Sequence, residues 1–483
     1  MKTRELAKES GRKWFPCNKG GGFRKWYGFN EYVANWQNDG EEMLSYAASL
    51  YGSPTRTIKN MDIYFQGGMT WGTISSGCLS MRHSDDGFVP EHAGGMIPIK
   101  NWDDRATYVL GAMNSSSADA FLKILSPTLR YTEGPVGLTP IAFSGDEASK
   151  SAVISFVEES ESLARNDWDS FETSWDFVRH PMAYVNAEGP TRIADTYARW
   201  ESQCRERFDA LKADEEELNR IFARIYHMEG EVPIEVPDDK VSVRLADRAR
   251  DARSLVSYAI GCLFGRYSTE AEGLVLADHG ATVNDYREKV PDAAFPPDAD
   301  NVLPVLADEW FDDDVVTGVR RWLAHAYGEE ALEENVAWLE ESLGKDLRSY
   351  LCKDFYADHL KVYQKRPIYW MFQSPKKSFQ CLVYMHRYDE GTVGTILTGY
   401  LRPLEDKLRA RLQVLESPGA RASDVREANK VRGMIAELEQ WEREVIYPLA
   451  HERVSIDLDD GVKVNYNKFP RALAKVPGLS EWK

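Results

Sequence analysis

The stretch WFPCNKGGGFRKWYGFNEYVANW (residues 14–36) combines three consecutive glycines with closely spaced aromatic and basic side chains. Glycine lets the backbone approach a ligand closely and adopt positive φ. Aromatic faces beside Arg or Lys suit base stacking and phosphate contacts. The stretch therefore fits two structures: a loop that binds nucleic acid, or a glycine-rich hairpin whose aromatic side chains fill a core.

The length and composition are those of a globular protein. The chain has 483 residues, which predicts roughly two to four domains. It is 43% hydrophobic and 28% charged, a composition that allows a sizeable buried core. No segment approaches the ~18 consecutive apolar residues of a membrane span. The charged opening MKTRELAKESGRKW lacks the apolar region of a signal peptide, so we expect a cytoplasmic protein with no membrane partner.

The spacing of cysteine and histidine does not predict a metal site. The six cysteines lie far apart in the sequence, which disfavours zinc ribbons and CxxC redox sites and fits buried thiols in a reducing compartment. The nine histidines show neither HxxxH nor HExxH spacing. We therefore expect no bound structural metal.

Charge is distributed unevenly along the chain, whose net charge is −18. Residues 1–130 hold 15 Lys and Arg against 13 Asp and Glu, a net +2, so the remaining residues carry −20. Phosphate contacts need Lys and Arg. Any DNA contact is therefore expected in the N-terminal part, which also contains the stretch at residues 14–36.

We predict an α+β fold with three domains. Residues 1–150 are expected to form a mixed α/β domain, because short β-prone runs alternate with glycine turns between residues 60 and 99. Helices are expected at residues 41–50 and, with an Asn or Ser cap, at 119–125, whereas 106–113 fit either a strand or a helix. Residues 151–365 are predicted to be mainly helical.

Residues 366–483 are predicted to form the third domain. The runs PIYWMFQ and FQCLVYMH flank a polar turn and predict a β-hairpin. Residues 392–416 and 425–449 predict a helical hairpin, whose second helix would be capped by Ser423 or Asp424 and carries an apolar stripe. The end of the chain, VSIDLDDGVKVNYNKF, predicts a strand pair that turns at Asp460 and Gly461.

No catalytic constellation stands out in the sequence. The segment DWDSFETSWDF (residues 167–177) is rich in carboxylates, which can perform acid–base chemistry, but carboxylates at a helix end usually face solvent. The glycines at 20–22 are not followed by a helix that would complete a dinucleotide site. The sequence most similar to an Asn-Pro-Pro-aromatic loop, at residues 295–298, lacks the amide that would hold an exocyclic amine.

The chain nevertheless resembles one family over nearly its whole length: the adenine-specific DNA methyltransferases of BREX phage-defence systems, known as PglX. The resemblance lies in KWFPCNKGGGFRKWYGFNEYVANW, GGMTWGTISSGCLSMRHSDDGF, NDWDSFETSWDF, LVSYAIGCLFGRYS, EEALEENVAWLEESLGKDLR, KRPIYWMFQSPKKSFQCLVYMHRY, REVIYPLA and IDLDDGVKVNYNKF. Such enzymes place an S-adenosylmethionine-dependent catalytic domain first, followed by a target-recognition domain and a helical C-terminal region. The resemblance implies that this chain begins near the recognition domain, with no catalytic residue of its own and with the cofactor and catalytic motifs located before Met1.

The resemblance also implies double-stranded DNA as a partner, with the contacts made by residues 1–150. A base-modifying enzyme flips its target base into the catalytic pocket, and the recognition domain sets the register. The candidate DNA-binding residues are the basic Lys19, Arg24, Lys25 and Arg82 for phosphate or guanine, the polar Asn30, Ser75, Ser76 and Asn114 for bases or backbone, and the aromatic Trp26, Tyr27 and Trp71 for stacking or loop support.

Two further hypotheses remain open. The chain could complete a methyltransferase together with a separately encoded catalytic chain and other BREX proteins. Alternatively, it could be a protein-interaction module of the defence complex that does not bind DNA, as the acidic charge beyond residue 130 and the helical hairpin suggest.

Overall fold

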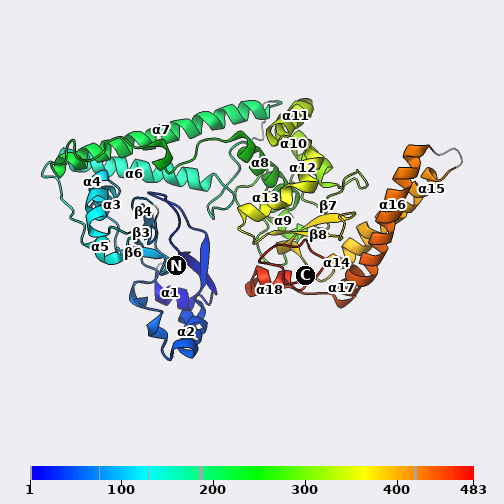
Figure 1. Cartoon of the computed structure of the whole chain (residues 1–483), viewed down its shortest axis with the longest axis horizontal. Helices are drawn as coiled ribbons and strands as arrows, with labels where there is room; N and C mark the ends of the chain where they lie inside the picture. The colour runs from blue at the N-terminus through cyan, green and yellow to red at the C-terminus, as the bar shows by residue number, and fades with distance from the viewer. Residues whose placement is uncertain (1–2, 76, 129, 184–188, 418–420, 483) are drawn as a thin grey trace. The chain divides into compact units, whose positions relative to one another are not determined.

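The computed structural model describes residues 3–75, 77–128, 130–183, 189–417 and 421–482. They form two compact units: unit 1 comprises Met1–Asp176 and Glu201–Ala246, and unit 2 comprises Phe177–Trp200 and Asp247–Lys483 (Figure 1). Small sheets combined with many helices confirm the predicted α+β class. The helix α6 (Glu147–Asp169) crosses residue 150. The division into three domains stays a prediction.

In the described part of unit 1, six short strands form two three-stranded sheets. In the first, β1 (Trp14–Asn18) pairs antiparallel with β2 (Tyr32–Asn35) and parallel with β5 (Val89–Pro90). In the second, β3 (Gly68–Gly72) lies between β4 (Met81–Ser84) and β6 (Gly94–Pro98), antiparallel to both. The strands and turns predicted between residues 60 and 99 are thus confirmed.

Unit 1 also contains α1 (Arg4–Glu9), α2 (Gln37–Tyr51), α3 (Asp104–Met113), α4 (Ser116–Leu125), α5 (Glu133–Gly137), α6, most of α7 (Ile193–Ile225), and the 3₁₀ turns η1 (Pro54–Arg56), η2 (Met61–Ile63) and η3 (Asp238–Lys240). The helix predicted at residues 41–50 is confirmed and ends at Gly52, whose φ is 75°. The helix α4 has the predicted serine cap, because the Ser115 hydroxyl accepts a hydrogen bond from the Ala118 amide. Residues 106–113 are helical.

Aromatic residues of the stretch at 14–36 lie in the core of unit 1. Trp26 is fully buried and packs in one cluster with Trp71, Leu110 and Val153. Trp36 is also buried and belongs to a smaller cluster beside β1 and β2. For these tryptophans, the core-filling interpretation of the stretch is the one that the structure confirms.

The glycines of unit 1 allow three backbone segments to meet at one place, which we call the glycine crossing: Gly20, Gly72 and Gly94. A Cβ atom on Gly72 would lie 2.7 Å from the Gly21 carbonyl oxygen. A Cβ atom on Gly94 would lie 2.7 Å from the Asn18 carbonyl oxygen. The glycine run therefore serves backbone packing between the two sheets of unit 1.

Unit 2 is built on a small antiparallel sheet in which β9 (Gln380–Tyr384) lies between β7 (Val302–Pro304) and β8 (Tyr369–Gln373). The pairing of β8 with β9 confirms the predicted hairpin. The helices are α8 (Arg248–Leu263), α9 (Val283–Lys289), α10 (Val315–Tyr327), α11 (Leu332–Leu343), α12 (Leu347–Lys353), α13 (Phe355–Val362), α14 (Thr392–Thr395), α15 (Arg402–Leu415), α16 (Ala422–Trp441), α17 (Tyr447–Glu452) and α18 (Val462–Tyr466).

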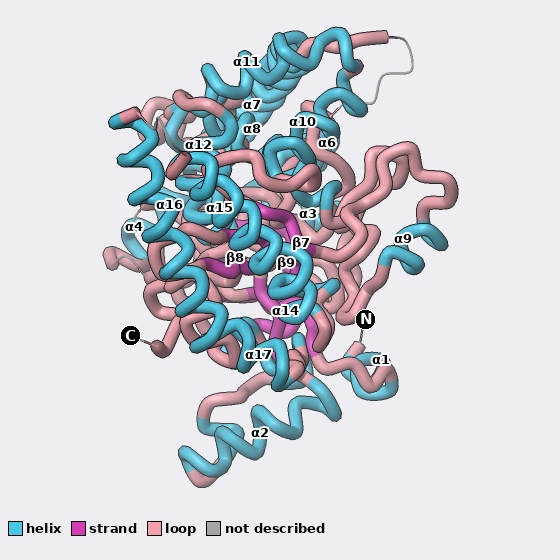
Figure 2. The backbone as a smooth tube through the Cα atoms, turned by 90° about the vertical axis from the view of Figure 1, so that its right-hand side faces the viewer, coloured by secondary structure: helices cyan, strands magenta, loops and turns pink. Residues whose placement is uncertain are grey.

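The predicted helical hairpin is confirmed by α15 and α16, which run side by side in Figures 1 and 2. Leu408 and Leu438 are buried in the unit 2 core, and Arg409 on α15 forms an ion pair with Glu439 on α16 at 2.8 Å. The predicted cap is wrong, because Ser423 and Asp424 lie inside α16. Asp424 instead accepts a hydrogen bond from the Arg421 amide, as an acidic residue in a first helical turn commonly does.

The strand pair predicted at the end of the chain is wrong. Residues Leu458–Asp460 form a 3₁₀ turn, and α18 follows after Gly461. The Asn465 side chain accepts from the Asp457 amide and donates to the Gly461 carbonyl oxygen, while Tyr466 is fully buried. Side-chain hydrogen bonds to the backbone and burial of Tyr466 together outweigh the β-propensity of the valines at this end.

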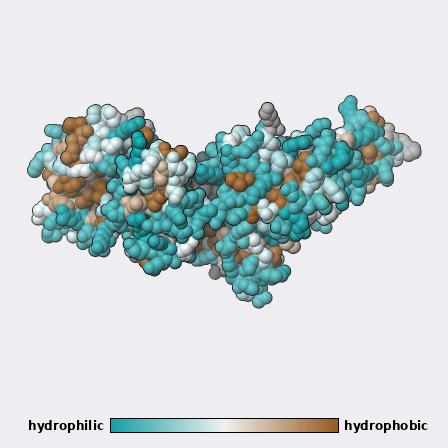
Figure 3. All heavy atoms as spheres, turned by 90° about the horizontal axis from the view of Figure 1, so that it is seen from below, coloured by the Kyte–Doolittle hydropathy of each residue, from teal (hydrophilic) through white to brown (hydrophobic). Residues whose placement is uncertain are grey.

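Hydrophilic side chains cover most of the face drawn in Figure 3, and hydrophobic residues form separate patches between them. Exposed apolar side chains of unit 1 include Tyr46, Ile74, Ile124 and Leu138. Within the described ranges, every helix is too short or too polar to cross a membrane.

The glycine crossing can be tested by Gly94→Ala. The new Cβ would contact the Asn18 carbonyl oxygen at 2.7 Å and the Gly20 nitrogen at 2.8 Å, so two backbone segments would have to move. We expect a loss of about 1–3 kcal/mol in the free energy of unfolding measured with urea. The control is Gly137→Ala, whose Cβ meets no atom within 4 Å. Equal stability of the two variants would contradict a packing role for Gly94.

Candidate nucleic-acid interface

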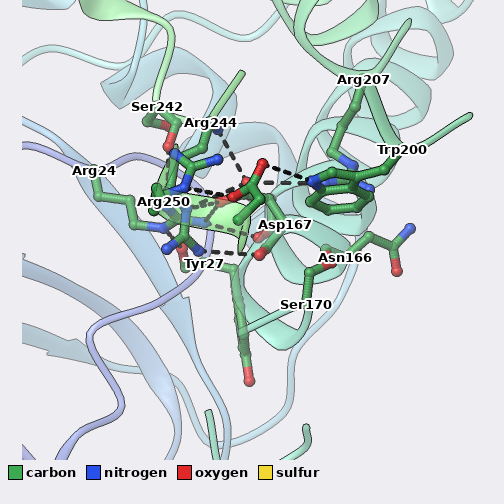
Figure 4. Close-up of polar contacts among 12 residues, drawn as sticks. Arg24, Tyr27, Asn166, Asp167, Ser170, Trp200, Arg207, Ser242, Arg244 and Arg250 are labelled. Carbon is green, nitrogen blue, oxygen red and sulfur yellow. Dashed lines mark hydrogen bonds and ion pairs between the residues drawn. The ribbon is translucent and has the colours of Figure 1, made fainter. Parts of the chain in front are cut away.

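Arg24 lies beneath the surface and uses its guanidinium to join three segments of unit 1 (Figure 4). Its Nε donates to the Tyr27 carbonyl oxygen at 2.7 Å, and Nη1 donates to the Ser242 carbonyl oxygen at 3.0 Å. Its Nη2 donates to the Ala164 carbonyl oxygen and to Asp167 Oδ2, both at 2.9 Å. These contacts give Arg24 a structural role; its predicted DNA contact stays a prediction.

Asp167, on the last turn of α6, is the acceptor around which these arginines gather. Arg244 donates to it from the backbone nitrogen at 3.0 Å and from Nε at 3.2 Å. Arg207 Nη1 lies 3.8 Å from Asp167 Oδ1. Three arginines thus share one carboxylate that is 0% exposed, which keeps the buried charge hydrogen-bonded.

The expectation that the carboxylates of residues 167–177 face solvent is wrong for Asp167 and Glu172, both of which are buried. The sequence placed Asp167 near a helix end, where an exposed carboxylate is common. Its partners Arg24 and Arg244 lie 143 and 77 residues away in sequence, so the spacing of neighbouring residues could not predict the cluster.

Lys25 and Trp26 share a second buried carboxylate, that of Glu215 on α7. Lys25 Nζ donates to Glu215 Oε2 at 2.8 Å, and Trp26 Nε1 donates to Oε1 at 2.7 Å. Lys25 is 7% exposed and Trp26 is 0% exposed. Both side chains hold the stretch at residues 14–36 against α7 and do not reach the surface.

Tyr27, Trp71 and Asn114 are buried as well. The Arg165 guanidinium stacks over the Tyr27 ring at 3.8 Å, and burial raises the pKa of Tyr27 to about 12. Trp71 Nε1 donates to the Tyr131 carbonyl oxygen at 2.7 Å. The Asn114 side chain accepts from the Met81 amide at 2.9 Å and donates to the Met81 carbonyl oxygen at 3.0 Å, so it pairs with the backbone of the first residue of β4.

Arg82, on β4, differs from the buried Arg24 and Lys25. It is 1% exposed, and its Nη1 donates to the Arg24 carbonyl oxygen at 3.2 Å. Within the described residues, its guanidinium forms no ion pair with a carboxylate. Burial, together with the nearby Arg24, lowers the pKa of Arg82 to about 9.

Lys19, Asn30 and Ser75 are the predicted residues with appreciable exposure. Lys19 is exposed, with Nζ 4.6 Å from the centre of the Tyr32 ring. Asn30 is half-buried beside Tyr27. The Ser75 hydroxyl donates to the Cys78 carbonyl oxygen at 3.1 Å. Ser76 lies outside the described residues.

The structure adds exposed residues around the glycine crossing that the sequence did not single out. Ile74 is 64% exposed, and its backbone bridges to that of the exposed Arg130. The exposed His92 lies in the loop whose Ala93 carbonyl oxygen accepts from the Thr73 amide. We call the exposed face of Lys19, Ile74, His92 and Arg130 the crossing surface. Only tertiary pairing places Arg130 beside residue 74, so sequence spacing could not reveal it.

A cavity of about 390 Å³ adjoins this region, between the loop at residues 77–79, the start of α4 and the connector at 233–240. Its polar wall includes Lys25, Asn114 and Lys240, and its apolar wall includes Leu79 and Met113. Within the described residues, no three His, Cys, Asp or Glu side chains are placed to hold a metal ion. The cavity wall combines ammonium groups, amides and apolar side chains with the carboxylates of Asp119 and Glu235.

The Asp167 cluster can be tested by Asp167→Asn. The substitution would remove the negative charge that Arg24, Arg207 and Arg244 share, and the buried Arg24 would lose its ion pair. We expect the free energy of unfolding to fall by about 3–5 kcal/mol in urea titrations. Asp104→Asn, at an exposed residue in the first turn of α3, is the control and should change it by less than about 0.5 kcal/mol. A similarly small change in both variants would refute the cluster's structural role.

A second prediction concerns Asp214, a buried neighbour of Glu215. Burial, with Glu159 and Glu215 close by, raises the pKa of Asp214 to about 7. Between the unfolded pKa of about 4 and pH 7, the folded state therefore holds a proton that the unfolded state has lost, so stability falls as pH rises. Asp214 should lower the free energy of unfolding by at most about 1.4 kcal/mol per pH unit in this range. In Asp214→Asn, urea titrations between about pH 4 and pH 7 should no longer show this contribution. An unchanged pH profile would count against the raised pKa.

Comparison with known proteins places the chain in a family. No protein-family profile matches it. It is 36% identical over 479 residues to the adenine-specific methyltransferase PglX of Lacticaseibacillus casei (strain Zhang), a match that covers 95% of this chain and 39% of the relative. It is 34% identical over 513 residues to the adenine-specific methyltransferase BrxX of Escherichia coli O9:H4 (strain HS), covering 97% of this chain and 40% of the relative. The chain thus spans about two fifths of these relatives and belongs to the PglX family of BREX adenine-specific methyltransferases, as a C-terminal portion.

Proposed function

We propose that this chain is the target-recognition and scaffold portion of a BREX adenine-specific DNA methyltransferase that marks host DNA as self. The observation that carries the proposal is the 34–36% identity to two adenine-specific methyltransferases over 95–97% of the chain. Double-stranded DNA is the proposed ligand of unit 1. The rest of the enzyme and other BREX proteins are the proposed partners.

The proposed DNA contacts lie on the crossing surface. Lys19 and Arg130 bring two exposed cations to it, and Ile74 brings an exposed apolar side chain. Ser75 and Asn30 are partly exposed polar residues of the same unit. Cations of this kind bind phosphates and set the register of a protein on DNA, whereas polar and apolar side chains distinguish base edges. Buried Arg24, Lys25, Trp26, Tyr27, Trp71 and Asn114 would support this surface.

Methyl transfer is assigned in this proposal to the portion of the relatives that the chain does not span. Adenine methyltransferases use S-adenosylmethionine as the methyl donor, and a glycine-rich loop that opens a helix suits such a nucleotide-like cofactor. The glycines at 20–22 do not fit that task, since they pack against Gly72 and Ala93 and no helix follows them before β2. No catalytic step is therefore derived from residues of this chain.

One observation favours a different function, that of a protein-interaction module without DNA binding. Met43, Tyr46 and Leu50 lie at helical spacing on α2 and are 37%, 66% and 54% exposed. An exposed apolar helix face of this kind is common at protein interfaces. Under this alternative, DNA binding would be undetectable even at low salt.

The DNA proposal is tested by fluorescence anisotropy of a labelled duplex at 50–300 mM salt. A DNA-binding chain should show a slope of log K against log[salt] of about −0.9 for each phosphate contacted. The double variant Lys19→Met with Arg130→Met should reduce the magnitude of that slope by about 1.8, because two phosphate contacts are lost.

The matched control is Arg220→Met, which removes an exposed cation on α7, a helix that contributes no residue to the crossing surface. It should leave the slope unchanged. Absence of binding by the unsubstituted chain at the lowest salt would refute the DNA proposal and favour the interaction module.

A further inference from the structure

Arg82 carries a buried positive charge for which the described part of the chain supplies no negative partner. Its side chain is 1% exposed, as deeply buried as the paired Arg24 and Lys25. Each of those cations has a carboxylate within 2.9 Å, whereas the charged group described as acting on Arg82 is Arg24, another cation. Arg82 Nε also has no hydrogen-bond acceptor among the described residues. Buried charges are normally paired and hydrogen-bonded, so this exception calls for an explanation.

The ring of Phe29 covers one side of this guanidinium. The Arg82 Cζ atom lies 4.9 Å from the centre of the ring, and Phe29 itself is partly exposed. The ring also packs edge-on against Trp168 at 5.8 Å. Gly21 also lies against the ring, since a Cβ atom there would come within 2.5 Å of it. The partly exposed Phe29 thus covers part of the buried guanidinium, and glycine at position 21 leaves room for its ring.

The loop that places Phe29 is conformationally strained. Trp26 has φ of 72° and Phe29 has φ of 63°, in the left-handed region that bulky side chains rarely adopt. Gly28 between them has φ of 125°. Such strain costs of order 1–3 kcal/mol per residue and is found mainly at functional sites and switches. Trp26 is fixed by backbone hydrogen bonds to Met81 and His83, so the movable part is the segment that carries Phe29.

We propose that the Phe29 ring is a lid over Arg82. When the ring moves aside, the Arg82 guanidinium binds a phosphate group of the DNA backbone. This inference rests on the proposed function of unit 1 as a DNA reader. A phosphate supplies the negative charge that Arg82 lacks and accepts from its unpaired Nε through a charge-assisted hydrogen bond. Release of the strained φ of Phe29 offsets part of the free energy of opening.

The lid can be tested with Phe29→Asn, since Asn tolerates positive φ and lacks the ring. Phenylglyoxal modifies accessible arginines, and mass spectrometry detects the modified residue. Arg82 should resist modification in the unsubstituted chain and should be modified in Phe29→Asn. The control is Phe23→Asn, which removes another partly buried ring of the same stretch and should leave Arg82 unreactive. Bound duplex should protect Arg82 in Phe29→Asn.

The phosphate contact is tested with Arg82→Met in the same salt titration. The magnitude of the slope of log K against log[salt] should fall by about 0.9, because one phosphate contact is lost. Phe29→Asn should bind the duplex about fivefold more tightly, as expected if ~1 kcal/mol of opening free energy is removed. Combining it with Arg82→Met should abolish that gain. Thermal unfolding of each variant establishes that it is folded.

Several results would overturn the proposal. DNA binding with an unchanged slope in Arg82→Met would remove Arg82 from the interface while leaving the proposed function intact. If phenylglyoxal fails to modify Arg82 in folded Phe29→Asn, Phe29 does not act as a lid. Protection of Arg82 by inorganic phosphate to the same extent as by duplex would make it a site for the free anion and not for DNA. Absence of DNA binding by the unsubstituted chain would overturn this inference and the proposed function together.

Discussion

The buried carboxylate of Asp167 is the interaction on which the arrangement of unit 1 depends. It joins the end of α6 to Arg24 from the stretch at residues 14–36 and to Arg244 from the connector after α7. The same Arg24 guanidinium also donates to three backbone carbonyl oxygens, so a single side chain fixes the stretch at residues 14–36 against the rest of unit 1. Because charges in a low-dielectric interior must be paired, these segments can be buried only together.

The glycine crossing imposes a second constraint on the same unit. Gly20, Gly72 and Gly94 allow backbone to approach backbone at distances that any Cβ would prevent. These contacts bring together the segments that carry the exposed Lys19, Ile74, His92 and Arg130, although they come from four places in the sequence. Beneath these loops, the buried Arg24 and Lys25 are each paired with a carboxylate. Under the proposed function this arrangement holds the exposed loops in place, and base readout depends on loop placement.

Arg82 departs from the pairing seen at Arg24 and Lys25. Its neighbours each have a carboxylate, whereas Arg82 lies behind a partly exposed phenylalanine in a strained loop. The two irregularities occur at one place, which is why we connect them: the unpaired charge needs an anion, and the strained loop supplies a route by which an anion could reach it.

Much of the local structure could be predicted from sequence. The β8–β9 hairpin, the α15–α16 pair and the serine cap of α4 follow from hydrophobic period and capping residues, which act over a few neighbouring positions. The prediction of a strand pair at the end of the chain was wrong, because Asn465 and the buried Tyr466 stabilise a helical turn through contacts that β-propensity does not include. Asp167 was expected at the surface because its partners are too distant in sequence for any local pattern to include them.

The sequence by itself determined the family, the α+β class and the concentration of aromatic, glycine and basic residues in the N-terminal part. It could not decide which of those residues meet a ligand. Lys19 and Arg24 lie five positions apart with similar surroundings in sequence, yet one is exposed and the other is buried on Asp167. The physical reason is that exposure depends on which distant carboxylates and backbone carbonyls reach a cation after folding, and only the tertiary structure brings those groups together.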